Sequence, residues 1–87
     1  MPIMRSPNDM MDAAKDKLLD GRSPTTEAEW ALVTVFFTMN IVEEFRDISV
    51  PFLMKIFHCP LSSEAIRACI EIGKNEARMA RARENRN

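Results

Sequence analysis

The chain has 87 residues, of which 46% are hydrophobic and 29% are charged, and its formal net charge is -1. This length allows one small domain with a single core of marginal stability, and the apolar fraction is too high for a chain that is disordered throughout. Two cysteines cannot form a disulfide framework, and the longest apolar stretch, residues 30–42, is too short for a membrane span. We therefore expect a reducing compartment and no membrane partner.

The first expected element is a short N-terminal helix. Ser6 places a capping hydroxyl ahead of Pro7, which is tolerated in a first turn, and Gly21 supplies the stop. The apolar stripe between them is weak, and isolated helices of this length are marginal in water. The sequence therefore predicts an N-terminal extension over residues 1–22, frayed or in part disordered, ahead of a single helical binding domain over residues 23–87.

A second and longer helix is predicted over residues 24–45. Ser23 and Pro24 repeat the pattern of cap and first-turn proline, and Thr26 and Glu29 have the spacing of a capping box. A strand at residues 33–37 is the alternative, because β-branched and aromatic side chains favour strands. The flanking caps and the length of the apolar run favour the helix.

The interior of this second helix is apolar around almost its whole circumference. A surface helix normally carries one apolar stripe, whereas a helix that is apolar on all sides must be covered on all sides. The modest helices left in so short a chain are hard pressed to cover it. The sequence therefore predicts that helices of a partner complete the core.

Two further helices are expected after the second. Asp47 or Ser49 can cap the first of them, which ends before Pro60, and Ser62 can cap the last. The predicted fold class is therefore all-α. It is a small bundle with a short N-terminal helical extension and three core helices, which span about residues 24–45, 49–58 and 63–84.

Residues that could carry catalysis or bind metal are few. His58, Cys59 and Cys69 are the only imidazole or thiol ligands, whereas a structural zinc site takes four ligands, commonly in close pairs. Glu43 and Glu44 could form an acid and base pair, but carboxylates near a helix end are ordinarily solvated. Two glycines cannot form a loop that cradles phosphate. We therefore expect no enzyme activity, no metal and no cofactor.

The charge is unevenly distributed along the chain. Residues 1–47 hold five Lys or Arg against nine Asp or Glu, and residues 48–87 hold seven against four. Residues 50–84 also have a spacing like that of a helix-turn-helix, so a small nucleic-acid-binding protein that uses the basic C-terminal helix is the alternative function. Glu64 at the start of that helix and the lack of interleaved aromatic residues favour a solvated face and no nucleic acid.

Part of the chain resembles a known family. The resemblance rests on residues 36–42 (Phe-Phe-Thr-Met-Asn-Ile-Val), Asp47, residues 50–54, residues 61–66 (Leu-Ser-Ser-Glu-Ala-Ile) and the pair at 69–70. These residues resemble the mitotic-spindle organizing protein 1, or MOZART, family. That family has a long apolar helix ending in Ile-Leu, an Asp opening a short helix, and a Gly-Val-Asn-Pro-Glu-Ala-Leu turn into a third helix.

The resemblance implies a function, although Pro60 stands here where the family has its turn glycine and Gly73 where it has a leucine. It implies a non-enzymatic helical adaptor that binds the N-terminal helical region of a γ-tubulin complex protein. Such an adaptor supports assembly or recruitment of the γ-tubulin ring complex for microtubule nucleation. The implied location is the cytoplasm and cytoskeleton, at the microtubule-organizing centre, centrosome and spindle pole.

The apolar side chains of the three core helices are the expected binding site for the partner. The candidate residues are Val33, Phe36, Phe37, Met39, Ile41, Val42, Leu53, Met54, Phe57, Ile66, Cys69 and Ile70.

Overall fold

The computed structural model describes residues 6–44 and 50–85 and, within them, all side chains except those of residues 42–44 and 85. The predicted all-α class is confirmed: the described residues form helices and no strand. The helices are α1 (Pro7–Leu19), α2 (Glu27–Glu44), α3 (Val50–Ile56) and α4 (Ser63–Asn85). The strand alternative for residues 33–37 is wrong, because these residues lie in α2. The two expected caps of the third helix, Asp47 and Ser49, fall outside the described residues.

Side-chain caps start three of the helices. At α1 the Asp9 N–H donates to Ser6 Oγ over 3.2 Å, and the Ser6 N–H donates back to an Asp9 carboxylate oxygen. At α4 the Ala65 N–H donates to Ser62 Oγ over 3.1 Å, as the sequence predicts. Each bond satisfies one N–H that a helix start leaves without a partner.

The start of α2 lies three residues later than predicted. The Glu29 N–H donates to Thr26 Oγ over 3.1 Å, so Thr26 caps the helix and Glu27 is its first residue. Pro24 is buried in the connection that precedes this turn instead of opening it. The reason is that Thr26 satisfies a first-turn donor, whereas a proline only tolerates the loss of its own N–H.

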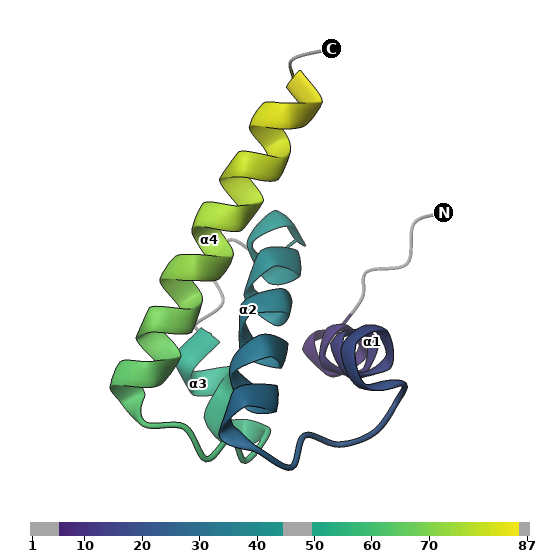
Figure 1. Ribbon diagram of the computed structural model, residues 1–87, viewed down its shortest axis with the longest axis vertical. Coiled ribbons are helices and arrows are strands. Elements are labelled where there is room, and N and C mark those ends of the chain that lie inside the picture. Colours follow the sequence, from purple (N-terminus) through teal and green to yellow (C-terminus); the bar gives the residue numbers. More distant parts are fainter. Residues whose placement is uncertain (1–5, 45–49, 86–87) are drawn as a thin grey trace.

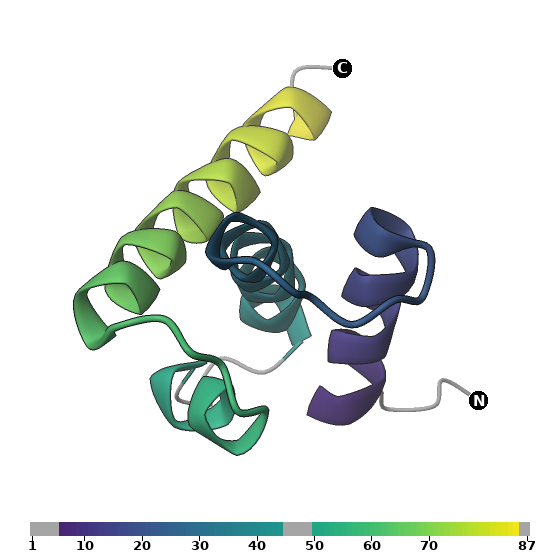
Figure 2. The same cartoon turned by 60° about the horizontal axis from the view of Figure 1, so that its bottom comes forward.

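Helix α2 lies at the centre of the bundle, with the other three helices around it (Figures 1 and 2). It packs most extensively against α4 and then against α1. In Figure 1, α2 and α4 both run up the page from their first residues, while α1 is seen nearly end-on. Figure 2 looks along α2 and shows α1 and α4 on opposite sides of it, with α3 on a third.

Helix α1 is part of the core. Met10, Met11 and Ala14 are buried almost completely and belong to the same apolar cluster as the buried side chains of α2, α3 and α4. Burial by tertiary contacts explains why a helix with a weak stripe of its own is ordered here. Lys17 of the same helix lies over the ring of Phe36 in α2, 6.0 Å from its centroid.

Helices α2 and α4 approach each other most closely at Gly73. A Cβ added to this glycine would lie 2.7 Å from Thr38 Cβ and 2.8 Å from the Val35 carbonyl oxygen. The buried hydroxyl of Thr38 donates to the Thr34 carbonyl within α2 over 2.8 Å, so it needs no partner across the interface. Small side chains on both helices therefore allow their backbones to pack closely.

The end of α3 is built from backbone hydrogen bonds. The Cys59 N–H donates to the Met54 carbonyl and the His58 N–H to the Lys55 carbonyl, each over 3.0 Å. His58 has a left-handed backbone (φ 62°), which is the conformation this motif requires after a helix. The last helical residue is Ile56, two residues before the predicted end, because this turn and not the following Pro60 stops the helix.

Candidate partner-binding surfaces

Most of the side chains expected to bind a partner lie in the core of the chain itself. The buried ones are Val33, Phe37, Ile41, Met54, Ile66, Cys69 and Ile70. Those that are partly buried are Phe36, Met39, Leu53 and Phe57. Val42 lies in α2, but its side chain is outside the described set. These residues are therefore brought together, but largely to cover α2 from within the chain.

Three consecutive residues show how α2 is covered. Phe36 lies under Lys17 of α1, and Phe37 packs edge-to-face on Phe57, directly after α3, with ring centroids 5.6 Å apart. Thr38 contacts Gly73 of α4. Because successive residues of a helix point about 100° apart, these three directions account for most of the circumference of α2.

The remaining direction is the one that follows Thr38 around the helix. Met39 points there, and Leu32 and Val35 share its stripe at spacings of seven and four residues. No other described helix covers this side of α2, which lies between α1 and α4 and opposite α3 (Figure 2). Leu32 is 57% exposed, whereas Val35 and Met39 are partly buried. On α2, the surplus of apolar surface that the sequence predicts is thus reduced to this one side.

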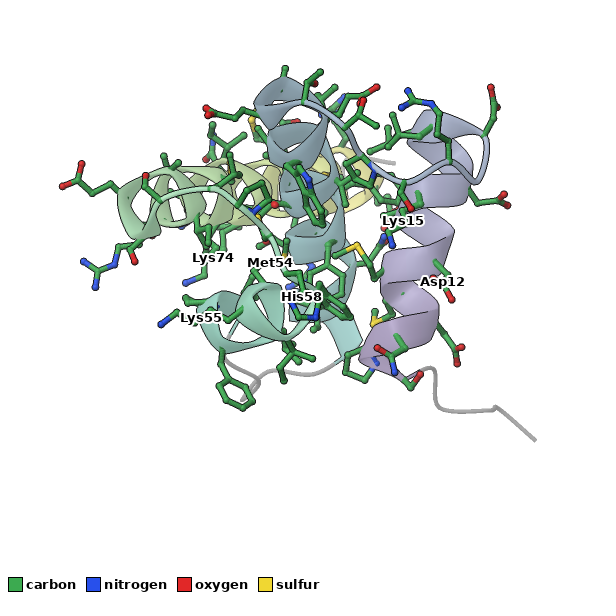
Figure 3. The ribbon with its side chains drawn as sticks, turned by 90° about the horizontal axis from the view of Figure 1, so that it is seen from below. Asp12, Lys15, Met54, Lys55, His58 and Lys74 are labelled. Carbon is green, nitrogen blue, oxygen red and sulfur yellow. The ribbon has the colours of Figure 1, made fainter. Side chains whose placement is uncertain are left out.

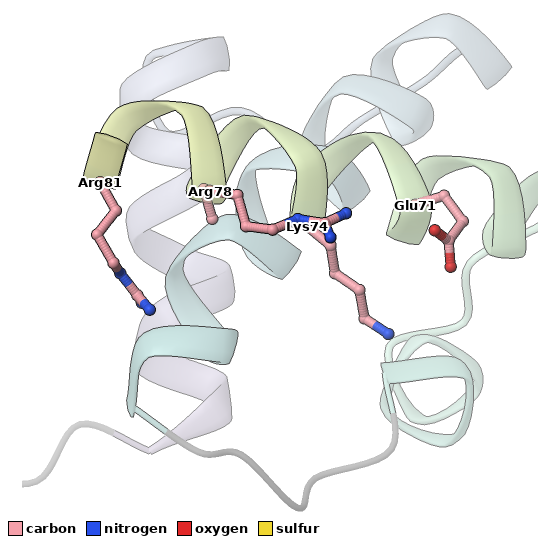
Figure 4. A pocket seen from close by; sticks show the side chains of 5 residues that line it. Glu71, Lys74, Arg78 and Arg81 are labelled. Carbon is pink, nitrogen blue, oxygen red and sulfur yellow. The ribbon is translucent and has the colours of Figure 1, made fainter. Parts of the chain in front are cut away.

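Helix α4 borders the same side with large apolar residues. Gly73 points at α2, so Ile72 and Lys74 flank the contact on its two sides. Figures 3 and 4 show Lys74 on the flank turned toward α3, which places Ile72, and Met79 seven residues later, on the opposite flank. Ile72 is 53% exposed and Met79 48%. We call the surface formed by Leu32, Val35 and Met39 of α2 and by Ile72 and Met79 of α4 the open face.

A second exposed apolar surface lies on α3. Phe52 is 63% exposed and Ile56 is 52% exposed, and their spacing of four residues puts them on one side of the helix. Met54, on the other side of α3, is fully buried in the core. This smaller surface lies on the far side of α2 from the open face.

A basic hollow of about 440 Å³ lies along the flank of α4 that faces α3 (Figure 4). Lys74, Arg78 and Arg81 line it at spacings of four and three residues, together with Ala77 and Glu71. Three cations on one helical stripe form a positive surface. This is the part of the C-terminal helix on which nucleic-acid binding would depend.

The connection between α1 and α2 is held by an ion pair. The guanidinium of Arg22 donates to both carboxylate oxygens of Glu29, and the Thr25 N–H and hydroxyl donate to the same carboxylate, each over 2.9 Å. Arg22 first and then Thr25 lower the pKa of Glu29 from its usual 4.5 to about 2. These bonds favour the ionised form, so the carboxylate stays charged at neutral pH.

The residues considered as metal ligands, His58, Cys59 and Cys69, occupy positions that are explained by the fold. His58 is exposed at the left-handed turn after α3, and Cys69 is buried on the inner side of α4. Burial, and then the charge of Cys59, raise the pKa of the Cys69 thiol. Among residues 6–44 and 50–85, no three His, Cys, Asp or Glu side chains gather closely enough to hold a metal ion.

The sequence did not single out Leu32 of α2, or Ile72 and Met79 of α4, as residues of the open face. Leu32 was one of many apolar residues in the second helix, and Ile72 and Met79 lie off the buried stripe of α4. A signal was present, since one flank of α4 carries a single charged residue, Glu76, from Ala65 to Met79, while the other is dense with charge.

Comparison with protein families, with curated proteins and with solved structures found no match to this chain. In the part of the chain that the structure describes, no helix combines the length and apolar character needed to cross a bilayer. Function is therefore proposed from the surfaces of the chain and from the family resemblance of residues 28–78.

Proposed function

We propose that this chain is a non-enzymatic helical adaptor. Its partner is the N-terminal helical region of a γ-tubulin complex protein, and it supports assembly or recruitment of the γ-tubulin ring complex for microtubule nucleation. It would act in the cytoplasm, on the cytoskeleton, at the microtubule-organizing centre, centrosome and spindle pole. The resemblance of residues 28–78 to the MOZART family names this partner.

One observation carries the need for a partner. Three large apolar side chains of the open face, Leu32, Ile72 and Met79, remain about half exposed after the chain has formed its core. Single exposed apolar residues are ordinary, but contiguous apolar patches on a small domain commonly mark interaction sites. The absence of charge on α2 from residue 30 to residue 42 has the same implication, because a solvated helix side normally carries polar residues.

Co-expression tests the proposed partner. The full chain would be produced with the N-terminal helical segment of a γ-tubulin complex protein and analysed by size-exclusion chromatography and thermal unfolding. We expect co-elution and a higher melting temperature, because a ligand at 100 times its dissociation constant stabilises the folded state by about 2.7 kcal/mol. Separate elution and an unchanged melting temperature would show that this protein is not the partner.

The basic hollow favours a second candidate function, the binding of DNA by α4. Phosphate binding depends on released counterions, so the affinity for DNA would fall steeply with salt, whereas an apolar helical interface barely responds. A titration of a labelled duplex from 50 to 200 mM salt separates the two functions. Under the adaptor proposal we expect weak DNA binding at low salt that Lys74→Ala and Arg78→Ala reduce, while co-elution with the protein partner is unchanged.

A further inference from the structure

We propose that the open face is the docking site for one amphipathic helix of the partner, which lies between α1 and α4 and completes the cover of α2. This inference rests on the proposed function for the identity of the partner. It assigns the surface and the kind of segment that binds there. The apolar surface of α3 is not part of this site.

The spacing of the residues along the uncovered side of α2 fits a packed helix. Ala28, Leu32, Val35 and Met39 follow one another at spacings of four, three and four residues. This alternation is typical of the seam along which two helices pack with a shallow crossing angle. The stripe carries no charge, so a partner can bury it without desolvating an ion.

The two flanks of α4 differ in chemistry. The flank that faces α3 carries Arg67, Glu71, Lys74, Arg78 and Arg81. The flank that borders the open face carries Ala65, Ala68, Ile72, Asn75 and Met79, again at spacings of three and four. Its polar groups are the Asn75 amide, which donates to the Met79 sulfur over 3.8 Å, and the partly buried Glu76, which is the single charged residue on this flank between Ala65 and Met79. If both flanks of α4 were equally solvated, both would be expected to carry many charged residues.

The size of the open face favours a single helix over a second copy of the chain. Leu32, Ile72 and Met79 are about half exposed, so the apolar area of the open face is on the order of 300 Å², the size of a typical functional patch. A stable dimer of ordinary size buries roughly 800 Å² and 20 to 30 residues on each partner. The stripes from Leu32 to Met39 and from Ile72 to Met79 each rise only about 10 Å, or two helical turns. The occupant is therefore a helix with apolar residues at heptad spacing.

Charge substitutions on the two apolar surfaces test this assignment. Leu32→Glu and Ile72→Glu place an unpaired charge in the open face, and Phe52→Glu, at a site of similar exposure on α3, is the matched control. Binding of the full-length chain is measured by fluorescence anisotropy with two labelled probes. One is the N-terminal helical segment of a γ-tubulin complex protein, and the other is a synthetic amphipathic helix with Leu at both apolar heptad positions. Circular dichroism checks that each variant keeps its fold, and Leu32→Gln and Ile72→Gln replace any that does not.

We expect each open-face substitution to weaken binding about 30-fold or more and Phe52→Glu to change it less than about threefold. If only the synthetic helix binds, and it binds through the open face, the docking site is supported and the proposed partner is wrong. Binding of neither probe by the wild-type chain would overturn the docking site. Loss in Phe52→Glu equal to that in the open-face variants, or a homodimer in light scattering that Leu32→Glu dissociates, would also overturn it.

Discussion

Gly73→Ala is the most informative single substitution for the fold. In most exposed helix interiors this change is favourable, because alanine has a better helix propensity than glycine by about 1 kcal/mol. Here the new methyl carbon would lie 2.7 Å from Thr38 Cβ and 2.8 Å from the Val35 carbonyl oxygen. Neither atom is at the end of a flexible side chain, so the helices themselves have to separate.

The size of the effect follows from that separation. Ordinary contact begins near 3.4 Å, so α4 must move about 0.7 Å away from α2. Overpacking of this kind costs about 1 to 3 kcal/mol, and a gap of this width also forfeits a quarter to a half of each dispersion contact. The α2–α4 pair is the most extensive in the chain. After the gain in propensity we expect a net loss of about 1 to 2 kcal/mol, which lowers the melting temperature by about 5 to 15 °C.

Thermal and urea unfolding followed by circular dichroism measure this loss. The control is Ala68→Gly, the reverse change at an exposed position of the same helix, which should cost about 1 kcal/mol through propensity alone. If Gly73→Ala instead raises the stability by as much as Ala68→Gly lowers it, the two helices are not in close contact at this glycine and the packing argument is wrong.

Three further predictions concern single side chains. The pKa of Glu29 is lowered to about 2, so the contribution of its carboxylate to stability is present above about pH 4.5 and is lost as the pH falls toward 2. The difference in the free energy of unfolding between wild type and Glu29→Gln should therefore shrink over that range. A constant difference would contradict the ion pair with Arg22. His58→Gly should stabilise the chain by about 0.5 to 1 kcal/mol in urea unfolding, because glycine adopts the left-handed turn without strain, and a loss of stability would contradict that geometry. Iodoacetamide should alkylate Cys59 at least about ten times faster than Cys69, as measured by mass spectrometry, because Cys69 is buried and the pKa of its thiol is raised. Equal rates would contradict the burial of Cys69.

The helices were predictable because their signals are local. Ser6 and Ser62 cap helices through hydrogen bonds to residues three positions on, and a sequence displays that spacing directly. The shift of the α2 start from residue 24 to Glu27 is an error of the same kind, since two adjacent cap patterns competed and the hydrogen-bonded one prevailed. Fold class therefore followed from the sequence, with element ends within about three residues.

The candidate binding surface was harder to predict, because its residues depend on tertiary packing. The apolar circumference of α2 was visible in the sequence, but which stripe faces α1, α3 or α4 is decided only when the helices pack. Phe37 illustrates the consequence: it was expected at a partner seam, yet it is fully buried against Phe57. A charge at Phe37 would therefore unfold the chain before it could report on binding, whereas Leu32 can be changed at the surface.

The rotational orientation of α2 is fixed, because Phe36, Phe37 and Thr38 each contact a different neighbouring element. Deletion or insertion of one residue within this helix would rotate everything beyond it by about 100°, so that each side chain would meet the wrong helix. An insertion of seven residues would nearly restore the original directions. The length of α2 should therefore tolerate far less variation than its side chains, and indels in this chain are best placed in the connection that precedes Thr26.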